Sequence, residues 1–401
     1  MDRQQLVAMI RRLESELANK KPKKADFHNS RQFDFEKHNR CRHVAFKLSY
    51  IGDKYHGFAH APDDTVPTVE SQIFDALLKT KLVPSIDRCG WSRCGRTDKG
   101  VSAFGQVVSL WVRTNKEWNG VDVVSWNEVS SHKNMRQGDK PACGDEDLPY
   151  LAMLNNVLPD DIRILAWAAA PSDFDARFSC VYRKYNYFFD ARNLDLQAMN
   201  EAAQMFVGTH DCRFICKIDP CKADRDSFFT RTIFESRIEA LEHSDRIHVF
   251  VVKGQAFLWH QVRNMMALLL LVGQRKEKVT VVRDMLDISK HPDGAGRPDY
   301  AMAPDGPLVL VECGFPPESI QWQTSDSKGL ISAVRVAELF DSMWVSAATR
   351  QCQLHTLITT YTEGLDISEN TRGKKYTPVM DRHRCASIIQ VREKNKRMKI
   401  E

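Results

Sequence analysis

A single carboxylate between two cations is the feature of this sequence with the clearest chemical potential. Asp98 lies between Arg96 and Lys99 in the segment Cys94–Gln106, whose three glycines let the backbone approach a ligand closely. A cation within about 4–6 Å lowers the pKa of a carboxyl group, so we expect Asp98 to be ionised and available as a nucleophile or general base. An ordinary turn residue is the alternative, because Asp is common in glycine-rich turns.

A second group of candidate residues lies in the segment Val181–Phe189, where cations alternate with aromatic rings. The period of two in a β-strand places Arg183, Tyr185 and Tyr187 on the same face. A face that combines cations with aromatic rings can stack on nucleobases and bind phosphates. A half-buried strand whose polar tips reach the solvent would show the same pattern, so both interpretations stay open.

A third group lies in the segment Gly254–Met266, which leads into a strongly apolar run. On a helix, His260, Arg263 and Asn264 would share one face, while the apolar residues that follow would face the core. A cation at the start of an apolar helix is costly unless it is paired. We therefore expect Arg263 either in a buried structural ion pair or as the partner of Asp98.

These segments together resemble one known family. Residues 95–103, Gly-Arg-Thr-Asp-Lys-Gly-Val-Ser-Ala, are similar to the catalytic-loop signature of the TruA family of tRNA pseudouridine synthases. Further similarities follow in the family's order. They are the strand and loop at 44–59, the Arg-x-Tyr element at 183–185, and the signature Phe-Leu-x-His-x-Val-Arg-Asn at 257–264.

The resemblance implies a role for each candidate residue. Asp98 would be the catalytic carboxylate, which attacks the sugar or removes a proton from it. Tyr185 would stack on the uracil and assist removal of the C5 proton, for which a phenol with a pKa of ~10 needs cationic neighbours. Arg263, with Arg96, would keep Asp98 ionised and hold the everted nucleotide. The expected substrate-binding residues are Arg96, Lys99, Arg183, His260 and Leu308, the last as a wall of the pocket.

The implied activity is the isomerisation of uridine to pseudouridine in tRNA. Atoms balance in this reaction, so we expect no cofactor and no metal, and the target base must leave its stack to reach Asp98. Residues 94–106 and the N-terminal segment most resemble eukaryotic members that act at positions 38 and 39 of the anticodon arm. The resemblance further implies tRNA as the partner, and we expect a homodimer in the nucleus and cytoplasm.

Two alternatives to this activity stay open. One is a eukaryotic paralogue with other tRNA targets, in which the catalytic loop usually begins with Ala at the place of Gly95. The other is a non-catalytic tRNA-binding or chaperone protein on the same scaffold. Replacement of Asp98, Tyr185 or Arg263 would have favoured the second alternative, and all three residues are present.

The elements that position these residues follow from the family and from the residue pattern. The resemblance implies an α+β fold with two α/β domains, each an antiparallel sheet with helices on one face, that form a basic central cleft. We expect an N-terminal helix and basic linker at 1–42, a first domain at 43–170, a second domain at 171–317, and a C-terminal extension with a basic tail at 318–401. Residues 115–147 are expected to be a partly disordered surface insertion.

Periodicity predicts the individual elements. The expected strands are 43–50, 107–112, 162–168, 181–189, 232–241, 246–253 and 308–312. The expected helices are 2–19, 69–78 after the N-cap Thr68, 150–157, 195–206, 260–271, 279–289 and 329–347.

Charge is concentrated at the two ends of the chain. Residues 1–43 carry 11 Lys and Arg against 6 Asp and Glu, and residues 371–401 carry 10 against 3. Basic ends on a balanced body favour a polyanionic partner whose phosphates supply the opposite charge. A pair of solvated, disordered tails is the alternative.

Eleven cysteines, with no apolar N-terminal segment, are expected to be reduced thiols of an intracellular protein. Cys212, Cys216 and Cys221 lie near His210 but lack the paired C-x-x-C of a zinc ribbon, so we expect free thiols. The longest apolar run, residues 265–272, is far shorter than the ~20 residues that span a bilayer, and no membrane role is expected.

Overall fold

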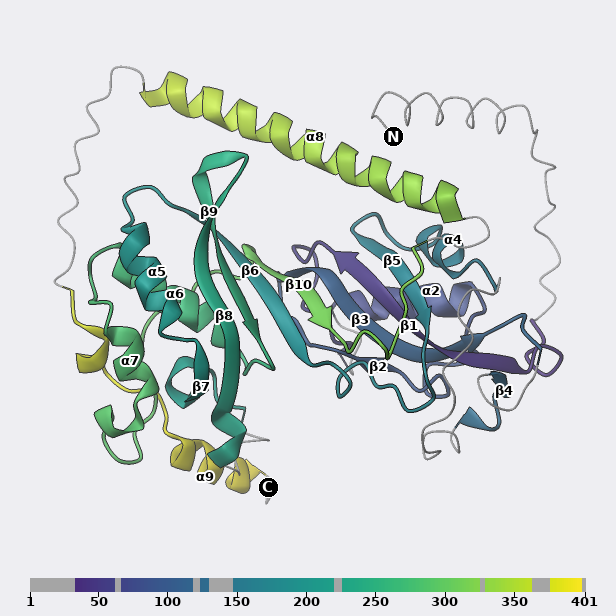
Figure 1. The fold of residues 1–401 in the computed structure, drawn as a ribbon, viewed down its shortest axis with the longest axis horizontal. Helices are drawn as coiled ribbons and strands as arrows, with labels where there is room; N and C mark the ends of the chain where they lie inside the picture. Colours follow the sequence, from purple (N-terminus) through teal and green to yellow (C-terminus); the bar gives the residue numbers. More distant parts are fainter. Residues whose placement is uncertain are drawn as a thin grey trace. The chain divides into compact units, whose positions relative to one another are not determined.

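A ten-stranded, mostly antiparallel sheet runs through the described part of the chain (Figure 1). The computed structural model describes residues 33–61, 66–117, 123–129, 147–219, 226–324, 329–362 and 376–398. The strand order is β4-β1-β3-β10-β6-β9-β8-β7, with β2 paired to β3 and β5 paired to β1. Residues 39–401 form one compact unit, and all the elements below belong to it.

The strands before residue 170 are arranged around β1. Their bounds are Arg40–Tyr50 (β1), Ser92–Arg93 (β2), Ser102–Arg113 (β3), Val123–Ser125 (β4) and Ile162–Ala169 (β5). β1 pairs with β3 along one edge and with β4 and β5 along the other. Nearly all of its side chains are buried, so β1 is a central strand that fixes the position of β3 and of the loop before it.

The last strand in the sequence joins the two halves of the sheet. The remaining strands are Tyr182–Asp190 (β6), Gly208–Asp211 (β7), Thr230–Leu241 (β8), Ser244–Gly254 (β9) and Leu308–Gly314 (β10). β10 lies between β3, to which it is parallel, and β6, to which it is antiparallel. Gly105 permits this contact, because a Cβ there would lie 2.2 Å from the Val311 carbonyl oxygen. Strands that we expected in two sheets therefore belong to one.

Seven α-helices are described along the chain. Their bounds are Val69–Lys79 (α2), Tyr150–Asn155 (α4), Leu196–Gln204 (α5), Gln261–Gly273 (α6), Val281–Leu286 (α7), Gly329–Thr362 (α8) and Ile388–Met398 (α9). Thr68 caps α2, as predicted, by accepting a hydrogen bond from the Ser71 N–H (3.2 Å). Short 3₁₀ turns lie at 213–215, 226–229, 288–290 and 379–381.

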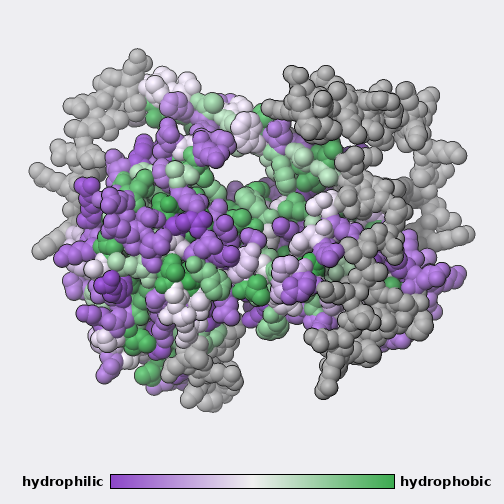
Figure 2. Space-filling view, viewed as in Figure 1, coloured by the Kyte–Doolittle hydropathy of each residue, from purple (hydrophilic) through white to green (hydrophobic). Residues whose placement is uncertain are grey.

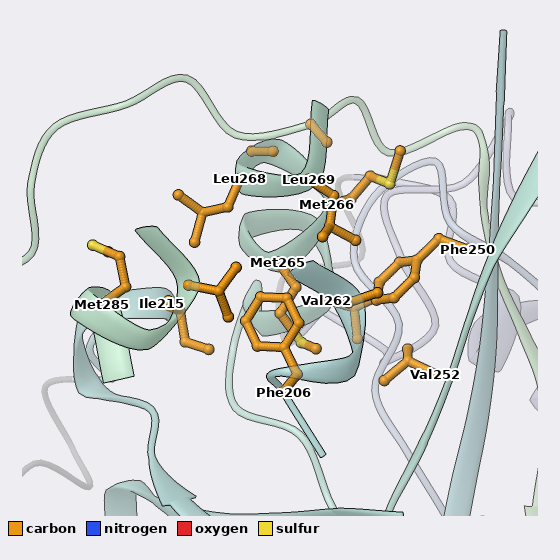
Figure 3. Close-up of a cluster of buried hydrophobic side chains, with 14 of the residues drawn as sticks. Phe206, Ile215, Phe250, Val252, Val262, Met265, Met266, Leu268, Leu269 and Met285 are labelled. Carbon is orange, nitrogen blue, oxygen red and sulfur yellow. The ribbon is translucent and has the colours of Figure 1, made fainter. Parts of the chain in front are cut away.

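A hydrophobic core surrounds α6, almost every residue of which is buried. Figure 3 shows apolar side chains of α6 together with Phe206, Phe250 and Val252 from the elements around it. α6 and the start of α5 approach closely at Gly273, where a Cβ would lie 2.4 Å from the sulfur of Met199. Burial on all sides gives the start of α6, where Arg263 lies, a fixed position in the fold.

The mixed α/β class is confirmed, and several predicted boundaries were wrong. β1 begins at Arg40, inside the predicted linker, because Arg42 is buried and its guanidinium binds Asp147 (3.2 Å). β4 lies inside the predicted insertion, where it pairs with residues 40–42 of β1. α6 begins one residue after His260, and α8 extends 15 residues beyond Ala347. The predicted helix at 2–19 lies outside the described residues.

The C-terminal region contains two further features. Residues 376–385 pack on the segment 277–297. The Tyr376 hydroxyl donates to Glu277 (2.6 Å), and the Cys385 N–H donates to the Arg297 carbonyl (2.8 Å). Along α8, hydrophobic side chains lie exposed between hydrophilic ones (Figure 2). Of the helices in the described ranges, none is both long enough and apolar enough to cross a membrane.

Candidate active site

The loop that carries Asp98 is held in place by the segment after β1. The Phe58 N–H donates to the Thr97 carbonyl (3.1 Å), and the Gly100 N–H donates to the Tyr55 carbonyl (3.2 Å). Gly57 has a φ of 104°, and a Cβ at this position would lie 2.9 Å from the Thr97 carbonyl oxygen, so only glycine fits here without strain. The backbone on both sides of Asp98 is thereby fixed.

His260 brings the second half of the chain to Asp98. Its Nε2 atom lies 3.5 Å from Asp98 Oδ2. His260 is the N-cap of α6 and has a left-handed backbone with a φ of 62°, a conformation uncommon for residues other than glycine. This turn directs the imidazole back towards the Asp98 loop while α6 runs into the core.

Arg263 and Asp305 complete a cluster of charged groups around Asp98. Arg263 is buried, its Nε donates to the Ala303 carbonyl (2.8 Å), and its Nη2 lies 3.8 Å from Asp305 Oδ2. The Asp305 side chain packs on the Asp98 loop, since a Cβ at Gly100 would lie 3.1 Å from its carboxylate. Arg263 thus pairs with Asp305, whose side chain is 44% exposed, so the expected ion pair forms but is only partly buried. The Arg263 charge also acts on Asp98.

Burial raises the pKa of Asp98 above its usual range. The charges of His260 and Arg263 and a hydrogen bond from Trp259 lower the pKa, and the Asp305 charge raises it. Our prediction of a lowered pKa was wrong because it counted nearby cations and not the loss of solvation, which is the larger effect here. Burial also lowers the pKa of His260, and the Asp98 charge opposes this shift.

Tyr185 lies on β6 with its ring edge-on to Phe257, at a centroid distance of 5.2 Å. Burial raises the pKa of Tyr185 far above its usual range, and the opposing charge of Arg183 does not compensate. The phenol is therefore neutral at physiological pH, suited to stacking and to donating a hydrogen bond. The geometry does not provide the cationic surroundings that proton removal by Tyr185 would need.

Four similarities to known proteins bear on this arrangement. Residues 202–316 match the family model described as tRNA pseudouridine synthase. The chain is 36% identical to the tRNA pseudouridine(38/39) synthase of Bos taurus over 96% of this chain and 84% of that protein. The chain belongs to the tRNA pseudouridine synthase family. It is also 37% identical to the Homo sapiens protein of the same name, over 89% of this chain and 77% of that one. The chain is 44% identical to the Saccharomyces cerevisiae protein of that name, over 77% of this chain and 64% of that one.

In this synthase, the other predicted site residues fall into two groups. Arg96 and Lys99 are exposed on the Asp98 loop, and Arg96 is not among the groups that set the pKa of Asp98. Leu308 is buried in the core cluster and pairs with Tyr187 across β10 and β6. Their predicted contacts with substrate stay predictions.

Arg183 connects the tyrosine strand of the synthase to the Asp98 loop. Its Nη1 donates to the Gln255 carbonyl (2.9 Å), and its Nη2 donates to the carbonyls of Cys94 (3.0 Å) and Arg177 (2.9 Å). A guanidinium that binds three carbonyls has few donors left for phosphate. We therefore regard Arg183 first as a support of the loop.

Sequence reasoning missed Asp305, Trp259 and the clamp around Gly57. The one signal for Asp305 was a negative charge in a Pro- and Gly-rich loop, which is typical of an ordinary turn. No group of three or more His, Cys, Asp or Glu residues in the described ranges is arranged to hold a metal. Cys212 and Cys216 are buried free thiols, and Cys221 lies outside the described residues.

Proposed function

We propose that this enzyme isomerises uridine to pseudouridine at positions 38 and 39 of the tRNA anticodon arm, with Asp98 as the catalytic carboxylate. The names of the three relatives above support the substrate. One structural observation carries the catalytic assignment: Asp98, His260 and Arg263 meet in one site although about 160 residues separate the first from the other two.

The reaction requires few groups beyond Asp98, His260 and Arg263. Pseudouridine formation breaks the bond between the sugar and the uracil nitrogen, forms a bond to C5 of the same base, and moves the C5 proton. A carboxylate whose pKa is raised by burial is a stronger base and nucleophile than one in water. Asp98 attacks the sugar or removes its proton, Arg263 stabilises the carboxylate, and neutral Tyr185 stacks on the uracil.

The tRNA is proposed to lie across the junction of the two predicted domains, 43–170 and 171–317, with a basic cleft around Asp98. The first supplies Asp98, and the second supplies Tyr185, His260 and Arg263. The target uridine must leave its stack, at a cost of a few kcal/mol. The basic terminal regions, 1–43 and 371–401, would bind phosphates on either side and make affinity depend on salt.

The enzyme is further proposed to act as a homodimer through α8. Four of the exposed apolar or aromatic side chains of α8 are Phe340, Trp344 (68%), Leu354 and Tyr361 (75%). Their positions fit one alternating 3- and 4-residue repeat, which is the pattern of a coiled-coil seam. A second copy of α8 matches both the length and the residue pattern of this face, and we propose it as the partner helix.

The Asp98→Asn variant tests the catalytic assignment. The amide keeps the shape of the side chain and removes its charge, so we expect no detectable pseudouridine in tRNA while tRNA binding persists. Asp190→Asn is the matched control, because Asp190 is an ion-paired carboxylate at the far end of β6 from Arg183. Full activity of Asp98→Asn would end the proposal.

A further inference from the structure

Phe178 is the most exposed of the large hydrophobic side chains in the described part of the chain, at 80%. The guanidinium of Arg177 lies over its ring, 5.3 Å from the centroid. A phenylalanine stabilises a fold mainly when it is buried in a core, and Phe178 forgoes most of that contribution. The ring therefore contributes little to the core and is accessible to a partner.

The loop that carries Phe178 is rigid. One Asp175 oxygen, Oδ1, accepts hydrogen bonds from the N–H groups of Arg177 (2.8 Å) and Phe178 (3.0 Å). The Ser179 N–H donates to the Asp175 carbonyl (2.9 Å), and the Ala176 N–H donates to the Ser109 hydroxyl (3.2 Å). An exposed ring on a fixed backbone is preorganised for binding, because little conformational entropy is lost on contact.

The same loop is tied to the catalytic loop. Arg183 Nη2 donates both to the Arg177 carbonyl and to the Cys94 carbonyl. Cys94 precedes Asp98 by four residues, a stretch of chain that reaches at most about 14 Å. One guanidinium thus anchors the loop of Phe178 to the loop of the catalytic carboxylate.

We propose that Phe178 stacks on a tRNA base next to the uridine that enters the active site. This inference rests on the proposed function and identifies one contact that it requires. Bases in RNA loops are commonly held by stacking on aromatic side chains. Eversion of the uridine removes one stacking partner from its neighbour, and a rigid ring at this place replaces that partner. The Arg177 guanidinium adds a cation that contacts the phosphate beside it.

Substitution of Phe178 separates stacking from folding. Loss of one base–aromatic stack lowers affinity roughly 5- to 150-fold, and we expect Phe178→Ala to lower kcat/KM for tRNA within that range. Phe178→Tyr should retain activity, because it keeps the ring. The thermal midpoint of both variants should equal that of the wild type, since the ring is exposed. Ile288→Ala is the control, because Ile288 is an exposed apolar residue (47%) in another element.

Photocrosslinking supplies a direct readout. An anticodon stem–loop RNA with 5-iodouridine on either side of the target, in turn, should crosslink to Phe178 from one of the two positions, and the peptide can be mapped by mass spectrometry. Wild-type kinetics for Phe178→Ala, or crosslinking from neither position, would overturn the inference. Asp98→Asn keeps the two claims apart, because its inactivity would uphold the proposed function even where Phe178 made no contact.

Discussion

Asp98 is held between two opposing influences. Burial raises its pKa, while His260, Arg263 and Trp259 lower it. The site therefore keeps a carboxylate that is more basic than one in solvent. Activity that depends on ionised Asp98 should fall as the pH decreases through this raised pKa. Asp305 adds a second negative charge to the same cluster. Its charge therefore affects the pH at which activity falls on the acid side of the pH profile.

Asp305→Asn should move that limb to lower pH. The Asp305 charge raises the pKa of Asp98, so its removal lowers the pKa and leaves the carboxylate ionised in more acidic solution. The measurement is kcat/KM against pH. The other charged groups that act on Asp98, His260 and Arg263, are unchanged in the variant. An acid limb at the wild-type position, with or without a loss of rate, would contradict this role for Asp305.

Asp98→Asn should also leave the protein as stable as the wild type, or more stable, near neutral pH. A carboxyl group with a raised pKa in the folded state opposes folding once the pH is above its pKa in the unfolded state. A neutral amide does not carry this cost. Residues retained for activity often reduce stability in this way, so their replacement can stabilise the fold. Thermal midpoints at neutral and acidic pH measure the difference, which should shrink in acid. A lower midpoint for the variant near neutrality would refute the argument.

Among the elements, Arg183 joins β6 to the Asp98 loop. Its three hydrogen bonds to carbonyl groups place the tyrosine strand and the catalytic loop at a fixed separation. This makes two interpretations of Arg183 distinguishable, because a structural support and a phosphate ligand respond differently to substitution.

Arg183→Met keeps the length of the side chain and removes its donors. We expect a loss of about 1 kcal/mol in the free energy of unfolding, because only the bond to the Cys94 carbonyl is partly shielded from solvent, together with a large decrease in kcat. Denaturant unfolding and steady-state kinetics provide the two numbers. If only KM and the salt dependence of binding changed, Arg183 would be a phosphate ligand, as the sequence first indicated.

The sequence predicted the elements of the site better than its electrostatics. Asp98, His260 and Arg263 were found because each lies in a segment that resembles a signature of the family; the residue pattern alone left ordinary structural roles open. The sign of the Asp98 pKa shift was missed, because burial is a property of the assembled fold. β4 was missed because its three residues lie in a polar segment. α8 was predicted too short because Gln351 and several threonines interrupt its apolar pattern.

At the scale of the whole molecule, α8 is the largest exposed apolar feature of the described residues. A helix of 34 residues is about 50 Å long, and its residues from 349 to 361 are all exposed. Helices in proteins gain most of their stability from packing of an apolar face. The exposed seam therefore gives the proposed homodimer a specific, breakable interface.

Trp344→Asp combined with Leu354→Asp should convert the dimer into a monomer. Both positions lie on the seam, where a buried unpaired charge is costly. Sedimentation over a range of protein concentrations measures the change. Ser342→Asp, on the same helix but off the seam, should leave the dimer intact. A wild-type protein that sediments as a monomer would contradict the proposed interface before any variant is made.

The place of β10 in the sheet has a consequence for synthesis on the ribosome. This strand is the last of the ten to be translated, yet it fills the slot between β3 and β6. Until residue 314 has emerged, a nascent chain would present two unpaired strand edges facing a gap, and such edges invite association with other chains. The catalytic centre therefore cannot assemble before residue 314 has been synthesised, and a protein cut short before that point would be prone to aggregate.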